Sequence, residues 1–254
     1  MITIRKSEER HHTESKDRKT WMTFDLANKA DPLKNGFSSL EILNEEILSP
    51  ESGFTLPTRK DMIVVTYVRE GMMIHIGPLA KPDSMIADDF QWAKITPGKK
   101  QYAFNTSESE DAHIFQCGFS PCEGVLKSDG GIKMLFTHAQ RQGVLRLIAS
   151  TDGRESSLSI QQDIEIYSTL LHKGNHIIHE IAPGKTTWLH VVKGHALMND
   201  LHVHTGDGAG FSEERVASFT AQMQTEILIF DLCGLLPEKV KDGLKDLPQT
   251  VKIP

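Results

Sequence analysis

The sequence contains no run of eighteen consecutive apolar residues, and only three of its 254 residues are cysteines. The first absence excludes a membrane-spanning helix of ordinary length. Cys117, Cys122 and Cys233 are too few, and odd in number, to form a disulfide framework, so we expect reduced thiols and a cytoplasmic location. The opening segment, Met1–Lys19, is polar and charged without an apolar stretch, so we expect no secretory signal there.

An excess of positive charge is also missing. The chain has 28 Lys and Arg against 34 Asp and Glu, which gives a net charge of −6. A chain of this charge has no general attraction to nucleic acid or to an anionic membrane, so we expect neither as a partner. Its hydrophobic share of 39% and charged share of 24% are those of a globular protein with a buried core, not of a disordered or collagen-like chain.

Helical periodicity is scarce, and short β-rich runs bounded by Gly, Pro, Asp and Asn are common. Many short strands separated by turn residues are typical of β-sandwiches and β-barrels. We therefore expect a mainly β fold with a few short helices, one of them at about 238–245. The expected strands are Met62–Val68, Met72–Ile76, Ile114–Phe119, Ser157–Tyr167, Trp188–Val192 and Glu226–Leu232.

A weak internal repeat is visible. Val68–Gly71 and Val192–Gly194 both read as a strand that ends in a glycine turn, and each is followed by apolar residues and then an acidic turn. Two copies of one β unit would produce this pattern. The polar, Gly- and Ser-rich region 123–156 would suit a linker between the two copies.

The common catalytic motifs are absent. Gly206-x-Gly208-x-Gly210 has neither the following helix of a dinucleotide-binding loop nor the Lys of a phosphate loop, and no Gly-x-Ser-x-Gly occurs. Cys122 lies in a turn, Ser-Pro-Cys-Glu-Gly, where a redox-sensing thiol is one open interpretation. Such a thiol needs a lowered pKa, and the neighbouring Glu123 acts in the opposite direction.

Seven of the twelve histidines lie between His172 and His204. On a strand, His202 and His204 would project from the same face about 7 Å apart, a spacing compatible with metal ligation. The favoured interpretation is structural: Leu201 and Val203 would form the apolar face, and the two histidines would face solvent.

An ordered set of short motifs along most of the chain resembles the pirin family. In the first half these are Trp21-x-Thr23-Phe24, Ala27-Asn28, Asp31-Pro32, Gly36-Phe37, Gly53-Phe54, Lys60-Asp61-Met62, Thr66-Tyr67-Val68, Glu70-Gly71, His75, Phe90-Gln91 and Asn105. In the second half they are Ser157-Leu158, Gln162-Asp163, Glu165, Tyr167, Val191-Val192-Lys193-Gly194 and Asp207-Gly208. The resemblance implies a bicupin, that is, two tandem jelly-roll-type β-barrels. We expect the N-terminal barrel at 1–130, the C-terminal barrel at 131–233 and a tail at 234–254.

The resemblance also implies an iron-type metal in the N-terminal barrel, held by an H-x-H and an H-x-E, but this chain departs from that pattern. The H-x-H positions are occupied by Pro57 and Arg59, and the H-x-E positions by Gln101 and Ala103. Pro and Ala carry no donor atom, and Arg is permanently cationic. We therefore expect no metal and no cofactor at this place, and no dioxygen chemistry that depends on them.

The substituted positions suggest a different ligand. Arg59 is suited to a bidentate contact with a carboxylate or phosphate, and Gln101, Tyr102 and His75 would complete the binding site. The principal hypothesis is a metal-free protein with a regulatory role that binds a small organic anion or a protein partner. Two enzyme alternatives stay open: a quercetin 2,3-dioxygenase, which the family resemblance implies, and a metal-independent enzyme built on Arg59, Tyr102 and His75.

Overall fold

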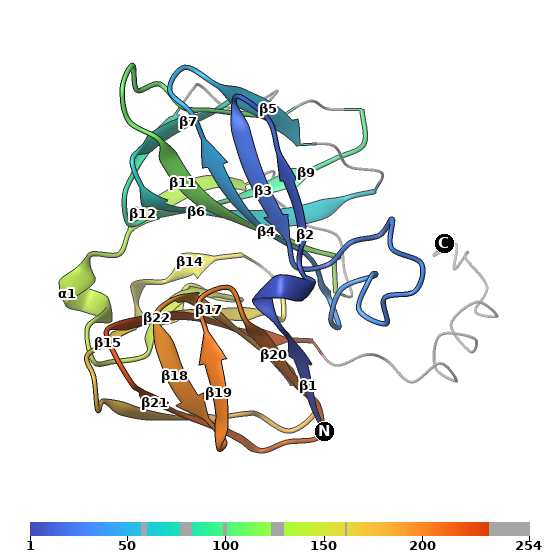
Figure 1. Cartoon of the computed structure of the whole chain (residues 1–254), viewed down its shortest axis with the longest axis vertical. Coiled ribbons are helices and arrows are strands. Elements are labelled where there is room, and N and C mark those ends of the chain that lie inside the picture. Colours follow the sequence, from blue (N-terminus) through green and yellow to red (C-terminus); the bar gives the residue numbers. More distant parts are fainter. Residues whose placement is uncertain (57–59, 77–82, 99–100, 123–129, 161, 234–254) are drawn as a thin grey trace, which may run out of the picture.

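The computed structural model shows a mainly β protein made of two barrels, one above the other in Figure 1. It describes residues 1–56, 60–76, 83–98, 101–122, 130–160 and 162–233. The fold class expected from the sequence, a bicupin with few helices, is confirmed.

The first barrel consists of two antiparallel sheets. Its larger sheet has the strand order β12-β9-β6-β11-β4-β3-β2, and its smaller sheet β5-β10-β7-β8. The larger sheet contains β2 (His11–Glu14), β3 (Arg18–Met22), β4 (Leu40–Leu48), β6 (Met62–Glu70), β9 (Asp89–Ile95), β11 (Ala112–Phe119) and β12 (Gly130–Leu135). The smaller sheet contains β5 (Gly53–Leu56), β7 (Met72–Ile76), β8 (Asp83–Ile86) and β10 (Gln101–Phe104).

The second barrel has the same design. Its larger sheet has the order β1-β20-β17-β22-β15-β13-β14, and its smaller sheet β16-β21-β18-β19. The larger sheet contains β1 (Ile2–Arg5), β13 (Arg146–Ser150), β14 (Leu158–Ser159), β15 (Glu165–Leu171), β17 (Thr186–Lys193), β20 (Gly208–Phe211) and β22 (Thr225–Leu232). The smaller sheet contains β16 (His176–Glu180), β18 (His195–Met198), β19 (Leu201–His204) and β21 (Val216–Ala221).

The internal repeat seen in the sequence corresponds to this shared topology. The order β9-β6-β11-β4 of the first barrel matches β20-β17-β22-β15 of the second, and β5-β10-β7-β8 matches β16-β21-β18-β19. The two glycine turns follow the equivalent strands β6 and β17. Gly71 and Gly194 both have positive φ, and a Cβ atom at either would lie 2.4 Å from a backbone carbonyl oxygen, so each turn requires glycine.

The larger sheets of the two barrels pack face to face. One cluster of buried residues joins Phe115 and Phe119 of β11 to Trp188 of β17 and Phe230 of β22. The other face of each large sheet lines the interior of its own barrel, where separate clusters form around Met73 and Phe219. Strands buried on both faces lose the alternation of apolar and polar residues. This explains why Met62–Val68 is continuously buried.

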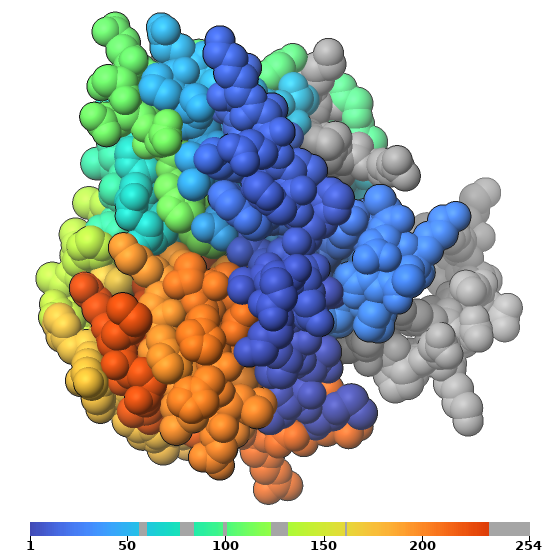
Figure 2. All heavy atoms as spheres, in the orientation of Figure 1, coloured from blue at the N-terminus to red at the C-terminus, as the bar shows by residue number. Residues whose placement is uncertain are grey.

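The N-terminal residues cross from one barrel to the other. β1 pairs with β20 of the second barrel, whereas β2 pairs with β3 of the first, and Figure 2 shows these residues as one band over both barrels. The expected domain limits differ here. Residues 2–5 belong to the second barrel, and β12, which begins at the expected boundary of 130/131, belongs to the first.

Region 123–156 is not the plain linker expected from its composition, because β12 and β13 lie within it and join different barrels. The connection between these strands includes the short helix α1 (His138–Arg141), and 3₁₀ turns occur at Ser7–Glu9 and Arg154–Ser156. The helix expected at 238–245 lies outside the described residues. No helix in the described part of the chain is long and apolar enough to cross a membrane.

Candidate functional site

The first candidate site is the inner wall of the first barrel, where strands β7 and β10 pair. His75 of β7 lies directly opposite Ala103 of β10, and both are buried, as is Gln101. Ala103 packs with Val68 and Ile114 of the opposite sheet, which shows that this face of β10 points into the barrel. The structure therefore brings three of the predicted site residues, His75, Gln101 and Ala103, to one wall.

Hydrogen bonds fix the side chains on this wall. The His75 Nδ1 atom lies 3.0 Å from Oε1 of Gln91, and Gln101 Nε2 donates to the Lys94 carbonyl at 3.1 Å. His75 Nε2 and Gln101 Oε1 are buried without a hydrogen-bond partner. Burial lowers the pKa of His75, and the amides of Gln91 and Gln101 oppose this only in part, so the imidazole is held neutral at pH 7.

Further uncharged polar side chains continue the wall across the larger sheet. Thr66 of β6 lies between Gln91 of β9 and Gln116 of β11 in the register, so the three side chains form one row. All three are buried, and Thr66 Oγ1 and both amide atoms of Gln116 have no partner. Buried polar atoms of this kind normally bind water or a ligand.

Tyr102 does not belong to this wall, contrary to expectation. Alternation along β10 places it between two inward-facing neighbours and therefore on the outer face, where it is 41% exposed. The expectation was wrong because it treated three consecutive strand residues as lining one pocket. Two other predicted positions, Pro57 and Arg59, lie outside the described residues.

Within the described residues, no group of three or more His, Cys, Asp or Glu side chains is arranged to hold a metal ion. Of the four positions at which the family pattern has ligands, the two described ones are Gln101 and Ala103. The first offers a neutral amide oxygen, and the second offers no donor atom.

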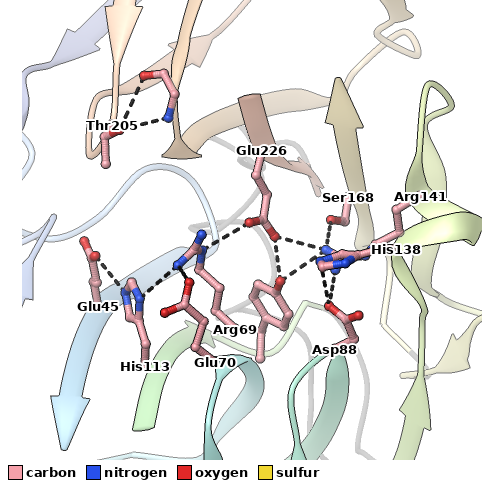
Figure 3. Close-up of polar contacts among 12 residues, drawn as sticks. Glu45, Arg69, Glu70, Asp88, His113, His138, Arg141, Ser168, Thr205 and Glu226 are labelled. Carbon is pink, nitrogen blue, oxygen red and sulfur yellow. Dashed lines mark hydrogen bonds and ion pairs between the residues drawn. The ribbon is translucent and has the colours of Figure 1, made fainter. Parts of the chain in front are cut away.

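The second candidate site is a polar network in the seam between the barrels, which sequence reasoning missed (Figure 3). Arg141 of α1 is fully buried and donates to Glu226 of β22 at 3.0 Å, to the Ser168 hydroxyl at 3.0 Å and to the Tyr67 hydroxyl at 3.2 Å. It also pairs with Asp88, which precedes β9. The network thus connects the linker helix with both barrels.

Glu226 is the centre of this network. Its Oε1 accepts from the Tyr67 hydroxyl at 2.6 Å, and its Oε2 accepts from Arg69 Nε at 3.2 Å. Figure 3 shows Arg69 and Arg141 on opposite sides of this carboxylate. Burial, with Glu226 adding to it, raises the pKa of Tyr67 well above its usual value, so the phenol stays protonated and donates its hydrogen. Each charged side chain in the network has a partner of opposite charge. The network therefore helps to hold the two barrels in one relative arrangement.

A groove of about 320 Å³ lies beside this network. It is lined by residues of both barrels and of α1, among them Arg69, Glu70, His138, Lys193, Met223 and Glu226. Its lining includes both acidic and basic side chains, so its charge does not favour a ligand of one sign.

Comparison with known proteins places these observations in a family. Residues 147–232 match the model of the quercetinase C-terminal cupin domain. A curated relative from Escherichia coli K12, named quercetin 2,3-dioxygenase, is 32% identical over 234 residues, which cover 91% of this chain and 99% of that protein. The chain belongs to the pirin family. A pirin-like protein of Caulobacter vibrioides is 26% identical over 82% of this chain and 89% of its own.

Solved structures of the pirin family have the same fold. The crystal structure of YhhW from Escherichia coli is 32% identical and matches with a TM-score of 0.84 over 93% of this chain and all of that one. A second structure, of bacterial pirin YhhW in complex with nickel(II), matches with a TM-score of 0.82 over 92% of this chain and all of that one. The bound nickel is a finding about that protein.

The cysteines of this pirin-family chain differ from expectation. Cys122 and Cys233 form a disulfide across a sequence separation of 111, and Cys117 is free and buried. The expectation of three reduced thiols, with Cys122 as a free redox-sensing one, was wrong for this pair. Cys122 follows β11 of the first barrel and Cys233 follows β22 of the second, so the packing of the large sheets brings two distant residues together.

The histidine-rich second half divides into buried and exposed groups. His190 is fully buried with both ring nitrogens unpartnered, and burial lowers its pKa to about 3. His202 and His204 are exposed, with the buried Val203 between them, as the alternation predicted. Leu201, however, is 42% exposed and is not part of the apolar face.

Proposed function

We propose that this chain is a metal-independent member of the pirin family whose first barrel binds a small organic anion. The observation that carries the proposal is the placement of Gln101 and Ala103 on the inner wall of β10, where the family pattern has an H-x-E. A methyl group cannot ligate a metal, and the Gln101 amide is already held by the Lys94 carbonyl. These residues do not fit the family's metal.

The other two positions support the same conclusion from sequence alone. Pro57 and Arg59 stand where the family has its H-x-H. A guanidinium at this point would repel a divalent cation and attract a carboxylate. Arg59 is thus the charged anchor of the proposed site, and the described wall supplies its uncharged polar partners.

His75 and Gln101 give the site its hydrogen-bonding character. His75 Nε2 and Gln101 Oε1 have no hydrogen-bond partner among the described residues. Because Gln91 Oε1 accepts the hydrogen of His75 Nδ1, the Nε2 atom of the neutral ring is an acceptor, as Gln101 Oε1 is. Both atoms would accept hydrogen bonds from hydroxyl groups of a ligand. A small hydroxycarboxylate would satisfy them through its hydroxyl groups, and its carboxylate would pair with Arg59.

The first test is the metal content of the untagged protein, measured by mass spectrometry after incubation with Fe(II), Mn(II), Cu(II) or Ni(II). The second is the shift in melting temperature with acetate, lactate, malate and citrate, compared between wild type, Arg59→Gln and a control, Lys60→Gln. We expect at least one carboxylate to stabilise wild type and the control but not Arg59→Gln. Stabilisation of all three proteins to the same extent would contradict the proposal.

One alternative is favoured by a specific observation. The 32% identical relative is named quercetin 2,3-dioxygenase. A dioxygenase of this kind predicts oxygen uptake with quercetin that depends on a bound metal. Such uptake by metal-loaded protein, lost after chelation, would replace the binding proposal with the enzyme one.

A further inference from the structure

Three histidines meet on the outer face of the β18–β19 hairpin. His195 and His204 are directly opposite each other in the register, and their rings stack with centroids 4.3 Å apart. His202 lies two residues before His204, and its Nδ1 atom is 2.8 Å from Nε2 of His195. The sequence indicated only the H-x-H at 202–204, because His195 joins it through strand pairing.

The hairpin holds these positions firmly. Its two-residue loop, Asn199 and Asp200, has positive φ at both positions, as the tight turns that fix a hairpin register require. Ala196 and Val203, which alternate with the histidines, are buried in the barrel core. The backbone is therefore fixed by its inner face, while the imidazoles lie on the outer face.

The fixed charges beside the three histidines balance each other. Lys6 brings one positive charge nearby, because its Nζ donates to the His202 carbonyl, but the same atom pairs with Asp207 at 3.0 Å. Asp207 Oδ2 lies 3.8 Å from His204 Nδ1, too far for a hydrogen bond, and accepts from the His204 backbone N–H instead.

We propose that His195, His202 and His204 form a binding site for a transition-metal ion of the Zn(II), Ni(II) or Cu(II) class on the surface of the second barrel. Neutral imidazole is a preferred ligand of all three ions. In the arrangement shown, two rings are stacked and two nitrogens share a hydrogen bond, so the rings must turn before three nitrogens converge. His204, with 58% of its side chain exposed, and the exposed His202 have room to do so.

This site is separate from the first barrel, and it bears on the test proposed there. A chain without metal in the first barrel would still carry one equivalent of metal on the hairpin. The two sources are distinguished by variants: metal retained by a His195→Ala, His204→Ala double variant would contradict the metal-independent first barrel. If the double variant binds no metal, the ion is located on the hairpin, and the proposal of a metal-independent first barrel stands.

The direct test is titration calorimetry of untagged, metal-stripped full-length protein with Zn(II), supported by the nitrogen hyperfine pattern of bound Cu(II). We expect about one equivalent for wild type and a dissociation constant raised at least about tenfold in His195→Ala and in His204→Ala, since loss of even an outer-shell partner costs about 10–100-fold. The control, His176→Ala, removes an exposed histidine from β16, which β21 separates from the hairpin, and should bind as wild type does. Equal affinity in all four proteins, or no binding by wild type at about 0.1 mM Zn(II), would overturn the proposal. Melting temperatures without metal verify that the variants fold.

Discussion

Glu45 and Glu46 are adjacent on β4, and their carboxyl groups lie on opposite faces of the same sheet. Glu45 faces the seam and accepts from Arg10 at 2.7 Å and from His113 at 2.9 Å. Glu46 accepts from Thr20 on the other face, and its nearest cation, Arg18, is 3.6 Å away. Burial raises the pKa of Glu46 to about 7, whereas His113 and Arg10 overcome burial and lower the pKa of Glu45 to about 2.

Glu46 should make the protein less stable as the pH rises. The pKa of Glu46 in the folded chain is above the unfolded value of about 4.5. Below pH 4.5 the carboxyl group is protonated in both states, so it does not lower the free energy of unfolding. Between pH 4.5 and 7 the unfolded state ionises first, and folding becomes less favourable. We expect Glu46→Gln, which can still accept from Thr20, to be about 3 kcal/mol more stable than wild type at pH 8 and nearly equal to it at pH 4. Urea unfolding at these two pH values measures the difference, and equal differences would contradict it.

Glu45 should have the opposite effect. Its pKa in the folded chain is depressed, so its stabilising contribution is complete above pH 4.5 and disappears as the pH falls toward 2. Glu45→Gln also leaves the buried guanidinium of Arg10 without its charge partner. We expect a loss of about 2–4 kcal/mol at pH 7, becoming smaller below pH 4. A loss that stays constant from pH 7 to pH 3 would show that charge is not its cause.

The seam network gives a third prediction. Arg141 and Glu226 are almost completely buried, and each is the main charge partner of the other. Removing Arg141 leaves Glu226 with Arg69 alone, and removing Glu226 leaves Arg141 with Asp88 alone. We expect Arg141→Met and Glu226→Gln each to lower the free energy of unfolding by about 2–4 kcal/mol, because each loses part of the compensation of a buried charge. The double variant Arg141→Met, Glu226→Met should lose clearly less than the sum of the two single losses, because both members of the pair are removed together.

The matched control for the seam is an exposed ion pair. Glu14 and Lys19 are 3.0 Å apart with about half of each side chain exposed. Lys19→Met should change the free energy of unfolding by less than about 0.5 kcal/mol in the same urea experiment. A strictly additive Arg141–Glu226 double variant would mean that the two residues do not act as a pair.

Local sequence patterns predicted the strands and the fold class well, but they could not predict contacts between residues far apart in the sequence. The runs that became β6 and β7 are visible from their composition, because a strand's apolar residues and its turn are neighbours in sequence. The alternation of inward and outward side chains along β10 would also have placed Tyr102 on the outer face of the barrel, but the expectation for Tyr102 did not take it into account. Arg141, by contrast, lies in a polar segment typical of a linker, and nothing near it signals a carboxylate at Glu226. Only the packing of two sheets brings such residues together.

The disulfide gives the last prediction. Cys122 and Cys233 join the ends of β11 and β22, one strand from each barrel, so the bond connects the two large sheets at one end of their seam. Burial raises the pKa of the Cys117 thiol, which should therefore not react in the folded protein. Thiol titration of unreduced protein in denaturant should find one thiol per chain, and three after reduction.

Loss of this bond should lower stability while leaving the fold intact. The loop that it closes is long, for which the chain-entropy model gives an upper value of about 4–5 kcal/mol. We expect Cys122→Ser to be destabilised by about 2–4 kcal/mol in urea unfolding and to be insensitive to reductant, since its remaining cysteines lack a partner. Cys117→Ser is the control: it should keep the bond, and reductant should destabilise it as it does wild type. Three thiols in unreduced wild type would mean that the two cysteines are close but not joined, and reductant would then change neither protein.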